Sequence, residues 1–430
     1  MPDSLSSWLA LLERRHPKSI DLGLDRCSEV WQAMGSPRPS PRVVTVGGTN
    51  GKGSAVAYLA ALLSSAGLRV GTYTSPHVLR FNERLQLPGG VATDAALVEA
   101  FEHVEEARGN TSLTYFEFSS LAIFHLMKEA DLDWAILEVG LGGRLDTVNL
   151  VDADATVIMP IGLDHQAYLG HDRETIGFEK AGILRDRVPL ICGDRNPPRS
   201  LISIASGLEA PVFILGRDFE VDRDAGMFRF GGTTEPIPVP APPLAGPHQY
   251  DNLATAIATA SILAPEVLED RAAWTQALDR VRVTGRLSAH AADARVMLDV
   301  GHNPLAAGVV ARALDECGAG KVHCVLGMLR DKDVESVAEI LSPCVARWYL
   351  AGLGGPRGQS GDELSRRLGS ILSNTHVDAY PGVAEALRAA RGSASETECI
   401  LVFGSFETVA VALRELDGGT GSAHQIQSGY

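Results

Sequence analysis

The feature that most constrains this chain of 430 residues is a glycine-rich segment, residues 47–54, which reads GGTNGKGS. It lies between the apolar, strand-like run 43–46 and the helix-like run 55–66, which Gly67 ends. A glycine-rich turn from a strand into a helix directs several backbone N–H groups and the positive helix end at one point, and Lys52 adds a full charge there. Such a point binds phosphate, so the segment predicts a nucleotide site, and we expect the nucleotide to be ATP.

The segment departs from the usual phosphate-binding pattern at one position. Gly53 follows Lys52, where a serine or threonine ordinarily supplies a hydroxyl to magnesium, and Ser54 comes one residue later. We therefore expect a second hydroxyl. Ser75 is the candidate because it follows the next strand-like run, 70–73, which would bring it to the phosphate end of a neighbouring parallel strand. A turn serine before a proline is the alternative.

The composition is that of a globular protein with room for two domains. Hydrophobic residues make up 45% of the chain and charged residues 21%. No stretch approaches the roughly 20 uninterrupted apolar residues of a membrane span, and the first residues have no basic region followed by an apolar one. We expect a cytoplasmic monomer with no membrane partner. The six cysteines form no C-x-x-C pair, so neither a disulfide framework nor a zinc site is indicated.

The charge of the chain argues against nucleic acid as a partner. A formal net charge of −15 would repel a phosphate backbone, and no basic run with interleaved aromatic residues offsets it. Small anionic ligands must then be held by local groups of cations. The candidates are Lys52, Arg286, and a set made of Arg80, Arg84 and Arg144.

Strand-like and helix-like runs alternate along the chain, which predicts an α/β protein whose mostly parallel sheet is flanked by helices. The strand-like runs form two sets, 43–46, 68–73, 134–139, 155–161 and 188–192, then 296–300, 322–326, 348–350 and 400–403. Residues 211–240 interrupt the first set and predict a small antiparallel excursion, after which a helix begins near Asp251 and Asn252.

The alternation divides the chain into two predicted domains. Residues 1–290 would form a phosphate-binding domain and residues 291–417 a smaller, Rossmann-like α/β domain, with the active site in the cleft between them. Residues 418–430 are rich in glycine and serine, and we expect them to be disordered.

Polar residues follow three strands of the first set. Glu138 ends an apolar strand-like run beside glycines and is the first candidate for a metal ligand, the alternative being a carboxylate paired with Arg144. His165 follows the next run, and a structural histidine is its alternative. Because the carboxyl ends of parallel strands meet at one edge of a sheet, Ser75, Glu138 and His165 would converge there.

Further candidates are less distinctive. Lys180 lies on a helix-like stretch and by itself indicates only a surface lysine. Asp299 ends a strand-like run and could accept ribose hydroxyls or cap a helix. Arg286 could reach nucleotide phosphates as a bidentate donor. The run 140–143 does not complete a dinucleotide-binding pattern, because Leu145 stands where glycine would be needed.

Together these segments resemble the folylpolyglutamate synthases, including bacterial forms that also act as dihydrofolate synthase, within the Mur ligase group of ATP-dependent amide-forming enzymes. The resemblance runs from about Trp8 to Leu416. It rests on the order and spacing of the segments 19–24 (SIDLGL), 48–54, 74–84, 113–118 (LTYFEF), 137–149, 163–170, 179–183, 284–287, 299–304, 327–333 and 404–409.

The resemblance implies a role for individual residues. ATP phosphates would be cradled by Thr49, Asn50, Gly51, Lys52, Gly53 and Ser54, and nucleotide would also be contacted by Asn252, Arg286, Asp299 and His302. One or two Mg²⁺ ions would be held by Ser75, Glu138 and His165, and Lys180 would be carbamylated, so that Lys52, Lys180, His165 and Glu138 form the catalytic set. Glutamate would be bound by His302 and Ser405. Dihydropteroate or folate would be bound by Asp21, Leu22, Gly23, Leu24, Arg80, Thr114, Tyr115, Phe116, Glu117, Leu145, Asp146 and Thr147.

The implied activity is an ATP- and Mg²⁺-dependent ligase with dihydropteroate, reduced folates and L-glutamate as substrates. It would add glutamate to dihydropteroate to give dihydrofolate and extend reduced folates by further glutamates, each time through an acyl phosphate. A Mur-type ligase for a cell-wall nucleotide precursor is the enzymatic alternative, against which the LTYFEF and SIDLGL segments argue. A nucleotide-gated switch is the alternative from another class, although no asparagine is followed by lysine as in the N-K-x-D pattern of guanine-specific switches.

Overall fold

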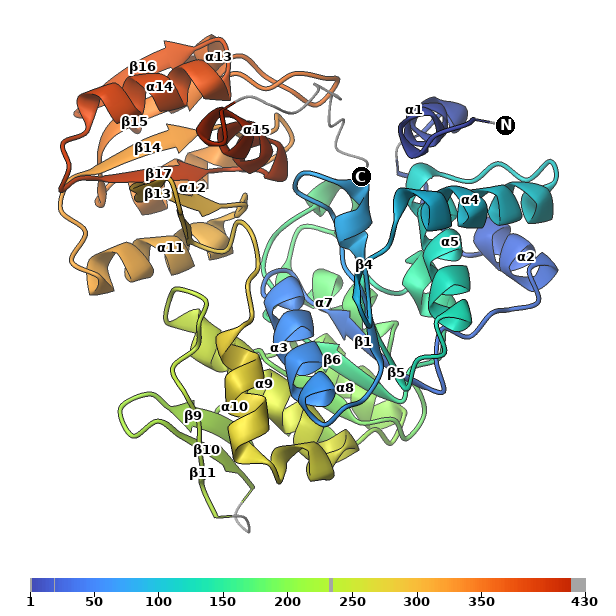
Figure 1. Ribbon diagram of the computed structural model, residues 1–430. Coiled ribbons are helices and arrows are strands. Elements are labelled where there is room, and N and C mark those ends of the chain that lie inside the picture. Colours follow the sequence, from blue (N-terminus) through green and yellow to red (C-terminus); the bar gives the residue numbers. More distant parts are fainter. Residues whose placement is uncertain (1, 19, 232–234, 419–430) are drawn as a thin grey trace.

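The computed structural model describes residues 2–18, 20–231 and 235–418, and it contains two large α/β sheets (Figure 1). Ser19 and, apart from Gly418, the tail that was expected to be disordered lie outside the described residues. Within these ranges no helix combines the length and the apolar character that crossing a membrane requires.

The first sheet has eight strands in the order β4-β3-β2-β5-β1-β6-β7-β8. All neighbours are parallel except the β2–β3 and β3–β4 pairs, which are antiparallel. In chain order the strands are β1 Arg42–Gly47, β2 Val70–Tyr73, β3 Leu85–Leu87, β4 Gly90–Val91, β5 Trp134–Glu138, β6 Ala155–Ile158, β7 Leu190–Cys192 and β8 Val212–Ile214.

Two hydrophobic clusters cover the two faces of this sheet. Side chains of β1 alternate between them: Val43 packs in one cluster, and Val44 and Val46 pack in the other. The first cluster takes apolar residues from α1 Leu5–Arg15, α2 Asp25–Ala33, α4 Asp94–Arg108, α5 Tyr115–Glu129, α7 Arg173–Ala181 and α8 Arg199–Gly207. The second takes them from α3 Lys52–Ser65, α9 His248–Leu263 and α10 Arg271–Asp279.

The second sheet has the order β12-β13-β17-β14-β15-β16, and only the β12–β13 pair is antiparallel. Its strands are β12 Ser288–His290, β13 Asp293–Asp299, β14 Val322–Leu326, β15 Val345–Ala351, β16 His376–Tyr380 and β17 Cys399–Phe403. Its helices are α11 Pro304–Glu316, α12 Val334–Leu341 and α13 Gly361–Leu368, which pack in one cluster, and α14 Val383–Ser393 and α15 Phe406–Leu416, which pack in another.

The predicted alternation is confirmed, with three local corrections. The helix expected near Asp251 begins at His248, directly after a proline. The antiparallel excursion consists of β9 Phe219–Asp222, β10 Met227–Phe230 and β11 Ile237–Pro238, whereas β8 belongs to the large sheet as a parallel strand. Strand β16 was not expected, because it is an edge strand with several exposed or half-buried residues and lacks an apolar run.

β12 lies within the predicted N-terminal range, yet it pairs in the second sheet; the boundary at residue 290 stays a prediction.

The two parts of the chain contact each other through a loop of the first sheet. Val78, in the loop after β2, is 6% exposed and joins the hydrophobic cluster that contains Val300 and Leu329 of the C-terminal part. The C-terminal sheet, drawn in orange and red, therefore stands against the edge of the first sheet from which this loop emerges (Figure 1).

The aromatic core beneath α1 predicts a local stability effect. Phe101 is fully buried. The centre of its ring lies 5.9 Å from the ring centre of Trp8, 5.6 Å from that of Phe81 and 5.5 Å from that of Phe118. We expect Phe101→Ala to lower the free energy of unfolding by about 3–5 kcal/mol through lost burial and a residual cavity. Urea unfolding followed by circular dichroism measures the change. Val91→Ala, at a half-exposed position, should stay within about 0.5 kcal/mol, and an equal loss in both variants would contradict the expectation.

Candidate active site

A cavity lies between the two parts of the chain, and residues of both parts line it. Strand register explains why side chains distant in sequence meet there. Val46, just before the glycine-rich loop, pairs with Glu138, and Tyr73, just before the Ser75 turn, pairs with Leu137. The carboxyl ends of β1, β2 and β5 are therefore level, and the residues that follow them face one space.

The phosphate loop is the backbone turn between β1 and α3. Gly48 and Gly51 have φ values of +133° and +86°, a conformation that glycine adopts without strain. A Cβ atom on Gly48 would lie 2.7 Å from the Cβ of Met159, so the loop also needs the close backbone approach that glycine allows. The N-terminal end of α3 thus opens directly on the cavity.

Lys52 lies in this loop with its charge directed at the site. Its Nζ donates to the carbonyl oxygens of Gly48 at 3.2 Å and Thr49 at 3.1 Å, and lies 3.9 Å from Oε1 of Glu138. Burial lowers the pKa of Lys52, and the nearby carboxylate of Glu138 opposes that shift. A phosphate arriving here would meet a cation that is already largely dehydrated.

Ser75 and Glu138 form a pair of oxygen ligands beside Lys52. The backbone N–H of Ser75 donates to Oε2 of Glu138 at 3.3 Å, while Oγ of Ser75 is buried and has no hydrogen-bond partner among the described residues. Burial raises the pKa of Glu138, against the effect of Lys52 and Arg286. The alternative pairing of Glu138 with Arg144 is wrong, because Arg144 pairs with Glu179 at 2.9 Å.

These groups fit a hard divalent cation. An unpartnered hydroxyl next to a buried carboxylate supplies the oxygen ligands that Mg²⁺ prefers. His165, which lines the same cavity, has its pKa lowered to about 3 by burial and by Lys332, so its imidazole is neutral, as a metal ligand must be. Ser75, Glu138 and His165 thus all line one cavity; their meeting at one metal ion stays a prediction.

Lys180 is a buried cavity residue, so its interpretation as a surface lysine is wrong. Its side chain comes from α7, is 4% exposed as a residue, and donates from Nζ to the carbonyl oxygen of Gly48 at 2.9 Å. Burial and the charge of Lys52 lower its pKa to about 7. A large part of the amine is therefore unprotonated, and hence nucleophilic, near neutral pH.

The residues expected to contact nucleotide lie around the loop. Arg286 lines the cavity, with its guanidinium 5.6 Å from the ring centre of Phe406. Asp299 also lines it and accepts from the N–H groups of Gly301 and Leu287; the helix α11 is capped by Asn303, so the alternative of Asp299 as helix cap is wrong. Asn252 lies behind Gly51, where a Cβ atom would come within 2.8 Å of its Oδ1.

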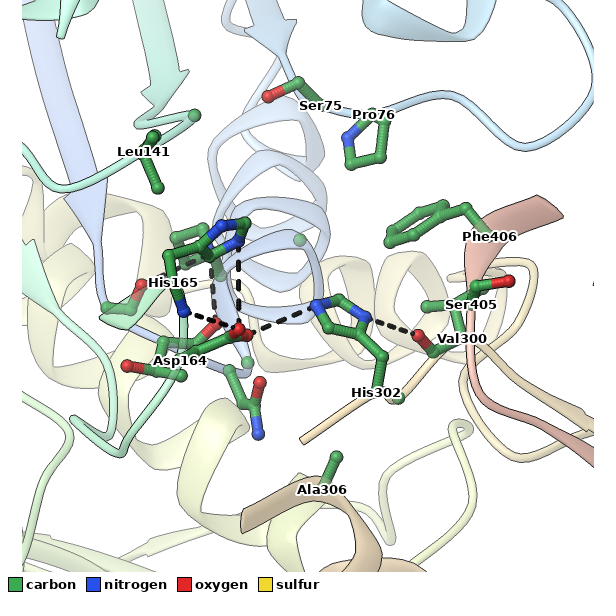
Figure 2. Close-up of a pocket in the computed structure, with 18 of the residues that line it drawn as sticks. Ser75, Pro76, Leu141, Asp164, His165, Val300, His302, Ala306, Ser405 and Phe406 are labelled. Carbon is green, nitrogen blue, oxygen red and sulfur yellow. Dashed lines mark hydrogen bonds and ion pairs between the residues drawn. The ribbon is translucent and has the colours of Figure 1, made fainter. Parts of the chain in front are cut away.

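Ser405 and His302 bring the C-terminal part to the same cavity (Figure 2). Ser405 is buried and caps α15 by accepting from the N–H of Thr408. His302 is held at both ring nitrogens, by the carbonyl oxygen of Val300 at 3.0 Å and by Oδ2 of Asp164 at 3.2 Å.

The three segments expected to bind the pterin lie in one region beside the cavity. Thr114 caps α5, and Glu117 completes the capping box by accepting from the N–H of Thr114. Arg26 donates to Glu117 at 2.9 Å and to Asp21 at 2.8 Å, and so links the two carboxylates. Asp146 accepts from the N–H of Leu141, a residue that lines the cavity, and burial raises the pKa of Asp146 to about 6. The other residues named for this site lie within the same three segments, Leu22, Gly23 and Leu24, Tyr115 and Phe116, and Leu145 and Thr147.

Arg80 does not face this space as expected. It is exposed and pairs with Asp94, whereas Arg84, one turn further on, is buried and lines the cavity. The spacing alone could not distinguish them, because both follow the same short strand and only the packing of the Phe81–Arg84 turn decides which one points inward.

Sequence reasoning missed several charged residues that line the cavity, among them Asp164 and Lys332. Both line the cavity, and Nζ of Lys332 lies 2.5 Å from Oδ1 of Asp164. The available signal was weak: Asp164 immediately precedes His165, and Lys332 lies in the 327–333 segment, to which no role was assigned.

Comparison with known proteins gives full-length relatives. Residues 285–406 match the glutamate ligase domain of the Mur ligases. The chain is 40% identical over 428 residues to the dihydrofolate synthase/folylpolyglutamate synthase of Haemophilus influenzae, covering 94% of this chain and 96% of the relative. It is 40% identical over 417 residues to the protein of the same name from Escherichia coli, covering 96% of each. The chain belongs to the dihydrofolate synthase/folylpolyglutamate synthase family.

Solved structures of this family have the same fold. Escherichia coli FolC in complex with DHPP and ADP has a TM-score of 0.89 and 38% identity, over 98% of this chain and all of that chain. The Yersinia pestis bifunctional folylpolyglutamate synthase/dihydrofolate synthase, complexed with AMPPNP and Mn ion, has a TM-score of 0.88 and 37% identity, over 97% and 100%. The expected family, the α/β fold and the class of enzyme, an ATP-dependent ligase of the Mur type, are confirmed.

The geometry of the phosphate loop predicts that ADP binding requires glycine at position 48. We expect Gly48→Ala to weaken ADP binding by about tenfold or more, because a Cβ at φ +133° is strained and would collide with Met159. Isothermal titration calorimetry measures the affinity. Gly67→Ala is the matched control: Gly67 also has positive φ, at +79°, but a Cβ atom there would meet no other atom within 4 Å, and the residue follows α3 at the end away from the loop. Equal ADP affinities for the two variants would contradict this account.

Proposed function

We propose that this protein is an ATP- and Mg²⁺-dependent ligase that joins L-glutamate to dihydropteroate, giving dihydrofolate, and then adds glutamates to reduced folates. The observation that supports it most is the cavity itself. It gathers the phosphate loop, a dehydrated lysine and a set of oxygen ligands beside the region of the three pterin segments. Relatives named for both synthase activities match nearly the whole chain.

The reaction explains why these groups are needed in one place. A carboxylate does not react with an amine at neutral pH, so an oxygen of the acceptor carboxylate attacks the γ-phosphorus of ATP, ADP leaves, and an acyl phosphate forms. The amine of glutamate then attacks the acyl carbon, phosphate leaves, and the amine loses a proton. Two anions must approach in the first step, so Lys52 and Arg286 contribute by neutralising charge.

Metal binding belongs to the same proposal. Ser75, Glu138 and His165 are the residues that would hold Mg²⁺, and the bound ion would lower the repulsion between nucleotide and carboxylate. Complexes of relatives contain Mn together with AMPPNP, and one of them L-glutamate as well. His302 and Ser405, which line the cavity from the C-terminal side, would bind the incoming glutamate. A cytoplasmic location and a monomeric state remain predictions.

Lys180 is proposed to carry a carbamate. Its neutral amine would attack the carbon of CO₂, form an N–C bond and release one proton, so that a neutral group becomes an anion. The lowered pKa supports this step, because only the unprotonated amine reacts. The positive charge of Lys52 would balance an anion at this position, because Lys52 and Lys180 donate to the same carbonyl oxygen, that of Gly48.

The function is tested by incubating the purified protein with ATP, Mg²⁺, labelled glutamate and a panel of acceptors. We expect amide product with dihydropteroate and with a reduced folate, identified by mass. Incorporation into a muramyl nucleotide but not into a pterin would overturn the proposed substrate, and ATP turnover without amide would favour a switch.

Glu138 provides the matched test of the site. We expect Glu138→Gln to lose acyl phosphate formation, trapped with hydroxylamine, by about a hundredfold or more, since an amide cannot balance a divalent cation. Glu209→Gln serves as the control because Glu209 is exposed and pairs only with Arg187 among the described ion pairs. Normal turnover of Glu138→Gln would remove this carboxylate from the metal site.

Lys180 predicts a dependence on CO₂ and pH. Its lowered pKa means that the neutral amine dominates above about pH 7 and the cation below it. We therefore expect that activity in CO₂-depleted buffer falls, that bicarbonate restores it, and that restoration weakens as the pH drops below that value. A carbamate carbon signal in NMR with ¹³C-bicarbonate, absent in Lys180→Met and present in Lys128→Met, identifies the residue. Full activity of Lys180→Met without CO₂ would contradict the carbamate.

A further inference from the structure

One buried carboxylate of the N-terminal part, that of Asp164, receives three contacts from the C-terminal part. Oδ1 lies 2.5 Å from Nζ of Lys332, and Oδ2 accepts from Nδ2 of Asn303 at 2.9 Å and lies 3.2 Å from Nε2 of His302. The side chains of Asp164 and Lys332 are only 9% and 6% exposed. Figure 2 shows Asp164 and His302 facing each other across the cavity, joined by a dashed line.

Each partner of Asp164 carries a different part of the site. His302 is fixed at its other ring nitrogen by Val300, so the two contacts together set the orientation of the imidazole. Asn303 caps α11 through Oδ1, and its side chain also meets that of Asn50 in the phosphate loop at 3.0 Å. A displacement of the C-terminal part would thus break contacts to the loop and to His302 at once.

A metal site is the competing interpretation of this cluster. Ligand atoms of Asp164, His165 and His302 all lie within 4.8 Å of one another. The ammonium of Lys332 already occupies this neighbourhood, 2.5 Å from Asp164 and 3.4 Å from Nε2 of His165. Because a cation within hydrogen-bond distance balances the carboxylate, the contacts favour an ion pair between the domains over a metal ion held by Asp164.

We propose that Asp164 is a positioning residue. Its ion pair with Lys332, which we call the clasp, holds the two parts of the enzyme together, and its contact with His302 orients that side chain towards the incoming glutamate. The proposal rests on the proposed ligase function. The clasp matters for the chemistry because an acyl phosphate is readily hydrolysed, so the cavity must be closed while the amine attacks.

Another ion pair between the two parts offers a matched comparison. Arg223 and Glu316 contact each other at 3.0 Å, and both side chains are 47% exposed. An exposed pair is weakened by water and salt, whereas a buried charge that loses its partner is left uncompensated. The Arg223–Glu316 pair and the Lys332–Asp164 pair therefore both join the two parts of the chain within hydrogen-bond distance, and they differ in burial.

The test compares Asp164→Asn, Lys332→Met, the double variant and Glu316→Gln. We expect Asp164→Asn and Lys332→Met each to lower kcat/KM for L-glutamate by about tenfold or more. The double variant should have a kcat/KM no more than about twofold below that of the less active single variant, because both substitutions remove the same interaction. The near-ultraviolet circular dichroism spectrum should stay that of the wild type, which a general loss of tertiary packing would not allow. Small-angle X-ray scattering with AMPPNP should give a larger radius of gyration for the clasp variants, while Glu316→Gln behaves as wild type.

Several outcomes would overturn the clasp. Additive losses in the double variant, an unchanged KM for glutamate, or equal effects of Glu316→Gln would each do so. Loss of bound Mn²⁺ in Asp164→Asn, with full activity of Lys332→Met, would assign the carboxylate to a metal instead. Should Asp164→Asn fail to fold, a comparison of Lys332→Met with Lys332→Arg tests the same contact from the lysine side. Only the arginine variant should then keep the wild-type radius of gyration with AMPPNP. If wild-type enzyme forms no amide with any acceptor, the proposed function fails, whereas the scattering comparison still decides the clasp.

Discussion

The site depends on the close approach of one backbone turn to the neighbouring strand end. Gly48 lies against Met159, and its carbonyl oxygen receives hydrogen bonds from both Lys52 and Lys180. A side chain at Gly48 would push the loop away from the strand end, and both lysines would lose their common acceptor. The position of the phosphate loop, and with it the charge that faces a nucleotide, thus follows from the absence of one Cβ atom.

Burial shifts the pKa values of the charged side chains beside the phosphate loop. Lys52, Lys180 and Glu138 are largely removed from water, which lowers the pKa of both lysines and raises that of the glutamate. The attraction between Lys52 and Glu138 offsets only part of that cost, and the charge of Lys52 adds to the shift of Lys180. A site arranged in this way gains stability when phosphates, a divalent cation or a carbamate bring the missing charges.

The two parts of the chain contribute unequal kinds of group. The first sheet supplies the phosphate loop, the carboxylate of Glu138 and the hydroxyl of Ser75 at strand ends, where register sets their spacing. The C-terminal part supplies His302, Ser405 and Lys332 from loops and helix starts, so their placement depends on how closely the two parts approach. Val78 buries an apolar contact in that approach, and Asp164 adds a charged one. Chemistry that needs both sets can proceed only when the parts are together.

The sequence by itself determined the alternation of strands and helices and the phosphate loop. It also predicted that Ser75, Glu138 and His165 would reach one cavity, because strand periodicity and the parallel arrangement place residues at known ends of a sheet. It also allowed the family to be expected from the order of its segments. It could not show that Lys180 is buried, that Arg84 rather than Arg80 faces the cavity, or that Lys332 meets Asp164. Those facts depend on which way a side chain points and on contacts between residues more than a hundred positions apart. Local patterns carry no information on such contacts, which arise only when distant segments pack. Helix α7 packs against the phosphate loop for Lys180, the Phe81–Arg84 turn orients Arg84, and the two parts of the chain meet at Lys332.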